Sequence, residues 1–97
     1  MKTTLFIFAT LYPKKESFEK ATAIIKSIID KTRKESGCIE FNLYEDLEDK
    51  KLYLYEQWRD ELSLKNHFTY DYTLEVIEDL KNYLEKQTDV IKMEKIK

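Results

Sequence analysis

The sequence predicts a single α+β domain, and three observations lead to this prediction. The chain has 97 residues, which is enough for one hydrophobic core and too short for two, so we expect one domain over residues 1–97. Hydrophobic residues make up 42% of the chain and aromatic residues 13%, a composition typical of a folded core rather than of disorder. Segments with helical spacing of apolar residues alternate with short runs rich in β-branched and aromatic residues, which indicates both helices and strands.

The first two elements are a strand and a helix. Residues 3–12 are rich in β-branched and aromatic side chains, and Pro13 ends this run, so we predict a strand. Between residues 17 and 35 the apolar side chains recur every three or four positions, which places them on one face of an amphipathic helix. Gly37, the only glycine of the chain, follows where a left-handed cap of this helix is expected.

The next two runs predict a β-hairpin. Residues 39–45 alternate between two faces, and we expect Ile39 and Phe41 to share one face of the strand. Residues 51–58 alternate again after a polar turn of about five residues, a usual length for a hairpin loop.

The last part of the chain predicts two helical stretches and a strand. Asp60 is a suitable N-cap for a helix through residue 68, and we expect a break or bend around residues 70–72. Helical spacing of apolar residues continues over 74–84, and residues 89–96 begin with the β-branched character of a strand. The resulting β-α-β-β-α-β order predicts the ferredoxin-like arrangement, in which helices cover one face of a four-stranded antiparallel sheet.

The first strand is apolar on both of its faces. Leu5 and Ile7 alternate with Phe6 and Phe8, whereas a half-exposed antiparallel strand alternates apolar with polar residues. Strand 51–58 likewise alternates leucines with tyrosines. Because the helices cover only one face, the other face would expose an aromatic patch of a kind that soluble monomers rarely carry. We therefore expect a homodimer in which two sheets pack face to face.

The charges of the chain nearly cancel, with 17 basic against 19 acidic residues and a net charge of −2. This balance gives no basic face of the kind that nucleic acid requires, so we expect no nucleic-acid partner. The apolar run near the start, residues 5–11, is too short to cross a bilayer and lacks a small-residue cleavage site, so we expect no membrane association and no secretory signal. Cys38 is the only cysteine, which favours a reducing, cytoplasmic location.

Three motifs in the middle of the chain share their spacing with a known family. Residues 36–44 read Ser-Gly-Cys-Ile-Glu-Phe-Asn-Leu-Tyr, and an acidic loop, a Tyr-Glu-Gln-Trp strand end at 55–58 and a Leu-x-x-His run from Leu64 to His67 follow. This pattern resembles the antibiotic biosynthesis monooxygenase (ABM) domain. The resemblance covers the whole chain in element order, with its motifs concentrated between residues 36 and 68.

The resemblance implies a dimeric α+β barrel with a pocket between the sheet and the helices. For some members it also implies oxygenation of quinol-like or polyphenolic aromatic molecules without a cofactor, so we expect such a monooxygenase here. Other members are isomerases of a phosphorylated signalling sugar, and a non-catalytic dimeric module that binds a small molecule is a further alternative. Haem degradation is not expected, because Val76 and Ile77 occupy the stretch where such members carry their iron-binding histidine.

His67 and Glu56 are the candidate catalytic residues. Histidine is the side chain whose ordinary pKa lies nearest neutrality, and the chain has only one, so His67 is the natural proton acceptor. Glu56 falls on the strand face that we assign to the helix side, where a carboxylate is costly unless it is paired. It could orient His67, or it could form a structural ion pair with a lysine or arginine. His67 could also be a structural residue of a helix face. With no companions at metal-ligand spacing, we expect no metal site.

Five further residues are candidates for substrate binding. They are Trp58, Leu54, Leu64, Phe68 and Tyr72. Trp58 could stack on a flat substrate or belong to the core, and Tyr72 is a possible hydroxyl donor at the pocket mouth. Two departures from the family pattern concern these positions. The members that oxidise aromatic molecules carry an amide and a tyrosine where this chain has Leu54 and Leu64, and many members have a second histidine in place of Tyr72.

Overall fold

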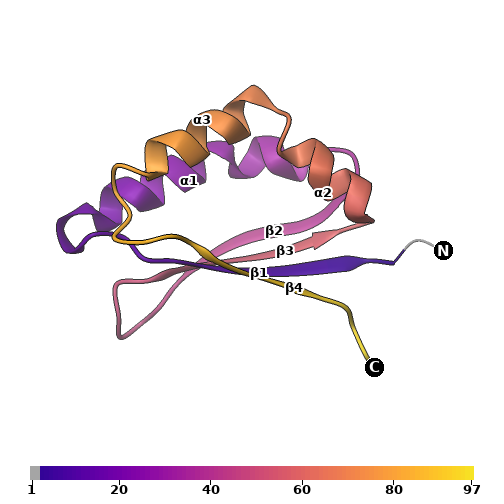
Figure 1. Ribbon diagram of the computed structural model, residues 1–97, viewed down its shortest axis with the longest axis horizontal. Coiled ribbons are helices and arrows are strands. Elements are labelled where there is room, and N and C mark those ends of the chain that lie inside the picture. Colours follow the sequence, from indigo (N-terminus) through magenta and orange to yellow (C-terminus); the bar gives the residue numbers. More distant parts are fainter. Residues whose placement is uncertain (1–2) are drawn as a thin grey trace.

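Residues 3–97 are described by a computed structural model, in which a four-stranded antiparallel sheet carries its helices on one face (Figure 1). The strands are β1 (Leu5–Leu11), β2 (Cys38–Glu45), β3 (Leu52–Trp58) and β4 (Asp89–Met93), and they lie in the order β2-β3-β1-β4. This order leaves the sheet open within one chain, with β2 and β4 at its edges. Met1 and Lys2, which precede the run compared with a secretory signal, lie outside the described residues.

The helices follow the predicted order, with one division. They are the 3-10 turn η1 (Lys15–Ser17), α1 (Phe18–Arg33), α2 (Glu61–His67) and α3 (Asp71–Leu80). The predicted ferredoxin-like order is confirmed, and the break that separates α2 from α3 lies at residues 68–70, slightly earlier than predicted. The Asp60 carboxylate caps α2 by accepting the backbone N–H of Ser63 at 2.8 Å. None of the helices between residues 3 and 97 has the length and apolar character needed to cross a bilayer.

The pairing register decides which side chains face the helices. In the β1–β3 pair Ile7 lies opposite Glu56 and Leu11 opposite Leu52, and directly opposed residues lie on the same face. Phe41 of β2 lies opposite Glu56 from the other side. Glu56 therefore belongs to the buried, helix-covered face of the sheet, among apolar side chains.

Two hydrophobic clusters fill the space between this face and the helices. The apolar cluster consists of Leu11, Ala21, Ile25, Leu52 and Leu80. The tryptophan cluster consists of Ile7, Phe41, Trp58 and Leu64. All of these side chains are 7% exposed or less, so both clusters are part of the core.

The turn between α1 and β2 differs from the prediction in one respect. α1 ends at Arg33, so Glu35 lies in the following turn rather than in the helix. Gly37 has the predicted left-handed conformation, with a φ of 85°, and helps to close this turn. A Cβ atom at Gly37 would lie 2.0 Å from the Ser63 Oγ of α2. Both the backbone angle and the close approach of α2 therefore require glycine here.

The start of β2 corrects another expectation. A β-bulge between Cys38 and Glu40 removes Ile39 from the regular pairing with β3. Ile39 is 53% exposed, whereas Phe41 is 2% exposed. The two residues therefore do not share the buried face, because the extra residue of the bulge breaks the alternation that the sequence analysis assumed.

Within residues 3–97 no helix covers the other face of the sheet (Figure 1). This face carries aromatic side chains. Phe6, Phe8, Tyr53 and Tyr55 all lie on this face and are half-buried. The rings of Phe8 and Tyr53 stack with their centroids 5.4 Å apart. The aromatic patch that the alternation predicted is therefore present on the outer face.

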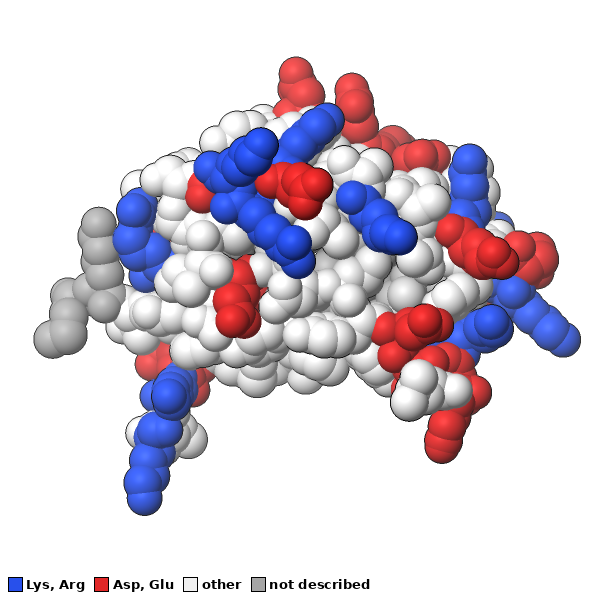
Figure 2. Space-filling model, turned by 180° about the vertical axis from the view of Figure 1, so that it is seen from behind, with Lys and Arg blue, Asp and Glu red and all other residues white. Residues whose placement is uncertain are grey.

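Charged side chains of both signs are interspersed on the face of the molecule seen in Figure 2. Exposed ion pairs of the chain include Lys81 with Glu78 at 2.9 Å and Lys92 with Glu61 at 2.8 Å. Exposed pairs of this kind contribute little to stability. Each pair does reduce the electrostatic field that its positive or its negative group would produce alone.

Candidate active site

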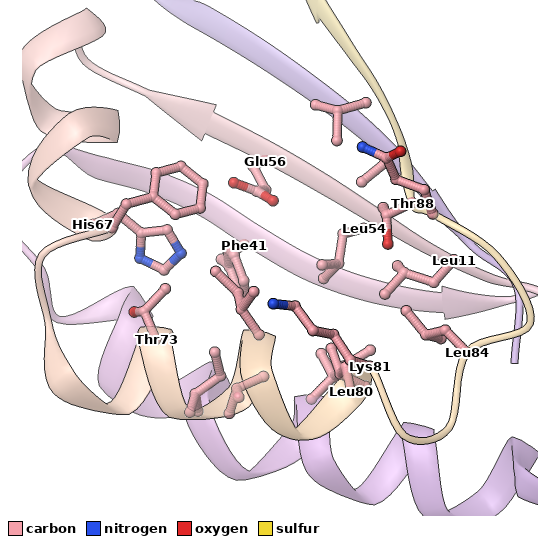
Figure 3. Close-up of a pocket in the computed structure, with 18 of the residues that line it drawn as sticks. Leu11, Phe41, Leu54, Glu56, His67, Thr73, Leu80, Lys81, Leu84 and Thr88 are labelled. Carbon is pink, nitrogen blue, oxygen red and sulfur yellow. The ribbon is translucent and has the colours of Figure 1, made fainter.

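A cavity of about 670 Å³ lies between the sheet and the helices. Its wall is mostly apolar and is formed by residues of all four strands, of α1 and α3, of the end of α2, and of the segment leading into β4. Figure 3 shows His67 at one end of the cavity with Glu56 beside it on the sheet, and Leu84 and Thr88 at the other end. His67 and Glu56 thus share the end where α2 meets β3, while Lys81 and Thr88 bring polar groups to the wall farther along.

The predicted site residues fall into two groups. His67, Glu56, Leu54 and Phe68 line the cavity. The other three, Trp58, Leu64 and Tyr72, are not among its lining residues. Leu64 is buried in the tryptophan cluster, and Trp58 contacts His67 and Glu56, which line the cavity. Tyr72 instead donates a hydrogen bond to Glu35, which does not line it.

His67 is the last residue of α2 and is 4% exposed. Its Nδ1 lies 3.0 Å from both carboxylate oxygens of Glu35. The ring is enclosed by three aromatic side chains, with centroid distances of 5.0 Å to Trp58, 5.1 Å to Phe68 and 5.7 Å to Phe41. Because an ionised carboxylate only accepts hydrogen bonds, a hydrogen bond between His67 and such a carboxylate requires the hydrogen on Nδ1, which leaves Nε2 for other partners.

Glu35 is a functional candidate that the sequence analysis missed. It is 8% exposed, and besides His67 it accepts a hydrogen bond from the Tyr72 hydroxyl at its Oε2. One signal in the sequence could have drawn attention to it. A carboxylate just after the C-terminus of a helix faces the negative end of the helix dipole, which is unfavourable. An acidic residue at this position therefore suggests that another contact holds it there.

Glu56 is held by its neighbour on the same strand. The Trp58 indole Nε1–H donates to Glu56 Oε1 at 2.8 Å. The pKa of Glu56 is raised from 4.5 to about 7, mainly by burial. The indole hydrogen bond lowers it in part, and the nearby Glu35 adds a smaller upward shift. Within residues 3–97 its hydrogen-bond partner is thus an indole rather than a lysine or arginine.

Trp58 lies behind His67 and Glu56 rather than at the cavity wall. It is 0% exposed, and it contacts the His67 ring while donating to Glu56. A tryptophan in this position fixes the orientation of two polar side chains at once. Trp58 is therefore placed against those two groups, and it presents no exposed ring face to the cavity.

The arrangement has clear chemical capacities. His67 can accept a proton at Nε2, and Glu56, with a pKa of about 7, can accept or donate one near neutral pH. Both groups border an apolar space, where electrostatic interactions are stronger than in water. Cys38 offers no comparable chemistry, because burial raises its pKa to about 11 and keeps the thiol protonated. Among residues 3–97 no group of three or more potential ligands is placed to hold a metal ion.

Comparisons with known proteins show which family and which relatives the chain resembles. The family described as antibiotic biosynthesis monooxygenase matches residues 4–79. An uncharacterized protein of Synechocystis, sll1783, is 37% identical over 78 residues, which are 79% of this chain and 51% of that protein. A Mycobacterium tuberculosis protein whose name is "Putative monooxygenase Rv0793" is 28% identical over 67 residues, or 69% of this chain and 66% of that one. The chain thus spans between half and two thirds of the length of these curated relatives.

Solved structures extend the likeness to nearly the whole chain. A conserved protein of Methanosarcina mazei is 32% identical with a TM-score of 0.90, covering 97% of this chain and 94% of its own. The structure of Rv0793 has a TM-score of 0.93 at 22% identity and covers 98% of this chain and 97% of that one. At that identity the second likeness shows the fold alone.

Proposed function

This chain belongs to the antibiotic biosynthesis monooxygenase family, and we propose that it is a monooxygenase for a quinol-like or polyphenolic aromatic molecule. The observation that carries this proposal is the pair of buried proton-transfer groups, His67 and Glu56, at one end of an apolar cavity. A cavity of about 670 Å³ has the size and the mostly apolar lining typical of small-molecule sites. A flat aromatic molecule suits such a lining.

The proposed chemistry begins with the removal of a phenolic proton. Dioxygen reacts slowly with neutral closed-shell aromatic molecules and faster with an electron-rich phenolate. His67 Nε2 accepts the proton, so that the O–H bond breaks and the phenolate oxygen keeps the electron pair. The cavity holds the anion away from water, where its charge is not stabilised by solvation.

The overall reaction balances without an added reductant. A hydroquinone and dioxygen give a hydroxylated quinone and water, so one oxygen atom enters the ring and the other leaves as water. The quinol supplies all of the electrons, and we therefore propose that no flavin, haem or metal is needed. Glu56 is partly protonated near neutral pH and can donate a proton to the oxygen that departs as water.

The cavity suits a phosphorylated sugar less well. Its wall is mostly apolar, and Glu35 and Glu56 bring two carboxyl groups to the end where the acid–base chemistry resides. A phosphate group at that end would be repelled by Glu56 when it is ionised, whereas Lys81 and Lys86 could balance a phosphate farther along the wall, so the argument rests mainly on the apolar lining. A non-catalytic binding module differs from the oxygenase in one measurable way, because it would bind quinols without turning them over.

Oxygen uptake by purified, metal-stripped protein tests the proposal. With a panel of hydroquinones and labelled dioxygen, we expect uptake above the non-enzymatic rate and one labelled oxygen atom in each quinone product. Formation of hydrogen peroxide with no label in the quinone would identify an oxidase instead. Binding of the quinols with no oxygen uptake would favour the binding module.

We also propose a homodimer through the outer face of the sheet. The aromatic patch of Phe6, Phe8, Tyr53 and Tyr55 supports it, as do Ile91 at 54% and Met93 at 36% exposure on the same face. Covering such a patch with a second copy stabilises the folded chain by roughly 25 cal/mol per Å² of apolar surface, before the costs of association. Light scattering should give twice the 11.8 kDa chain mass, and a stable monomer at micromolar concentration would contradict the dimer.

A further inference from the structure

Glu35 occupies a position that is unfavourable for a carboxylate unless something holds it there. It lies just past the C-terminus of α1 and is 8% exposed, so both the helix dipole and burial oppose its charge. The partners that offset this cost are specific. His67 Nδ1 lies 3.0 Å from each carboxylate oxygen, and Tyr72 donates its hydroxyl hydrogen to Oε2.

The backbone around Glu35 is built to keep it in place. The Glu35 carbonyl accepts the Cys38 N–H at 3.1 Å, and the turn between them requires the left-handed Gly37. The Gly37 carbonyl in turn accepts the Arg59 N–H at 2.7 Å, just before α2 begins. The turn that carries Glu35 is therefore attached to the start of the helix that ends in His67.

We propose that Glu35 is a positioning residue for His67. By accepting the Nδ1–H it selects the tautomer in which Nε2 carries the lone pair, on the side of the ring away from Glu35. Figure 3 shows one ring nitrogen of His67 turned toward the cavity. When a phenolic proton moves to Nε2, the positive charge of the imidazolium is balanced by the carboxylate 3.0 Å from Nδ1. The catalytic part of this inference rests on the proposed oxygenase, whereas the tautomer does not.

Tyr72 completes the arrangement by holding Glu35 rather than a substrate. Its hydroxyl is committed to Glu35 Oε2, and Tyr72 does not line the cavity. Burial and the neighbouring carboxylate raise the pKa of Tyr72 above its usual value, so the hydroxyl keeps its hydrogen at neutral pH. The hydrogen bond therefore persists across the range in which His67 would act.

The tautomer can be read directly because the chain contains a single histidine. Two-bond proton–nitrogen correlation spectra of ¹⁵N-labelled wild-type protein should show Nδ1 protonated and Nε2 unprotonated at a pH where the ring is neutral. The opposite tautomer in the wild type would overturn the inference. This measurement needs no variant and no substrate, so it decides the positioning role even where a substitution prevents folding.

Two variants and a control extend the test to catalysis. Glu35→Gln should mix the tautomers and lower kcat for a hydroquinone by about tenfold to a hundredfold, with little change in KM, because only the proton transfer is impaired. Tyr72→Phe should keep the tautomer and lower kcat less. Glu19→Gln, an exposed glutamate of α1, should match the parent in both readouts. An unchanged tautomer and kcat in Glu35→Gln would overturn the proposal. A wild type with the expected tautomer and no activity would count against the oxygenase alone.

Discussion

The two halves of the core achieve the same burial by different means. The apolar cluster around Leu52 and Ile25 contains only hydrocarbon side chains. The tryptophan cluster adjoins three buried titratable residues, Glu35, Glu56 and His67, each with a hydrogen-bond partner. Both halves lie on the same face of one sheet, so the difference comes from which side chains the strands and turns bring inward, not from the fold itself.

This difference separates stability from chemistry within one small domain. Apolar burial is favourable without further conditions, whereas a buried charge costs several kcal/mol unless partners compensate it. The tryptophan cluster therefore depends on specific hydrogen bonds, and the apolar cluster does not. Substitutions in the two halves should have different signatures, and four of them test the contrast.

The largest effect is expected from His67→Ala. Removing the proposed base should lower oxygen uptake with a hydroquinone by at least about a hundredfold, the lower range of general-base assistance. The measurement is kcat/KM from an oxygen electrode, on protein shown by circular dichroism to be folded. A variant as active as the parent would mean that another group removes the proton, even if the oxygenase activity is real.

Leu52→Ala probes the apolar cluster. Leu52 is 1% exposed and does not line the large cavity, so its truncation leaves a void without touching the site. We expect the free energy of unfolding to fall by about 2–5 kcal/mol in a denaturant titration. The activity of the molecules that stay folded should be close to that of the parent. A large loss of kcat at equal folded fraction would contradict the separation of the two halves.

Glu56→Gln should change how stability depends on pH. In the folded protein the pKa of Glu56 is raised from 4.5 to about 7, while in the unfolded chain the carboxyl ionises at its ordinary value. The parent therefore binds this proton more tightly when folded, and its free energy of unfolding falls as pH rises through that window. The glutamine variant stays neutral and loses this penalty, which is about 3 kcal/mol when fully developed.

The readout for Glu56→Gln is the difference between variant and parent unfolding free energies, measured at several pH values. This difference cancels the other titrating groups, which both proteins share. It should grow in favour of the variant from about pH 4 to about pH 8. Parallel curves for the two proteins would show that Glu56 ionises normally in the folded state.

Gly37→Ala should have the smallest effect of the four. The left-handed backbone at φ 85° and the Ser63 Oγ atom 2.0 Å from the new Cβ both oppose the substitution. We expect a loss of about 1–3 kcal/mol in unfolding free energy. In a double-mutant cycle, Ser63→Gly should relieve part of this loss, because it removes the clashing side chain. Strict additivity would show that backbone strain alone is responsible.

Much of the fold was predictable because it follows from local periodicity. The alternation of β3 placed Glu56 with Leu52 and Leu54, and the register confirms that these residues share a face. The bulge at Ile39 was not predictable, since nothing in the side-chain pattern marks one extra residue in a strand.

The candidate site was predictable only in part, for a related reason. His67 and Glu56 could be proposed from residue type and spacing. Glu35 lies 32 positions before its partner His67, and their contact depends on a turn and a helix docking together. The positions of Trp58 and Tyr72 behind the cavity wall likewise depend on how α2 and α3 are set relative to the sheet.

The edge strand β4 bears on how a ligand would reach the cavity between the sheet and the helices. All five of its residues are exposed, and its strand pairing is with β1 alone. Val90, together with residues 86–88 just before it, forms part of the cavity wall. In the single chain the least buried element therefore also forms part of the cavity wall, and local opening of β4 would widen the cavity while both core clusters stay intact. We expect its amide hydrogens to exchange with solvent long before those of β3, and bound ligand to slow that exchange.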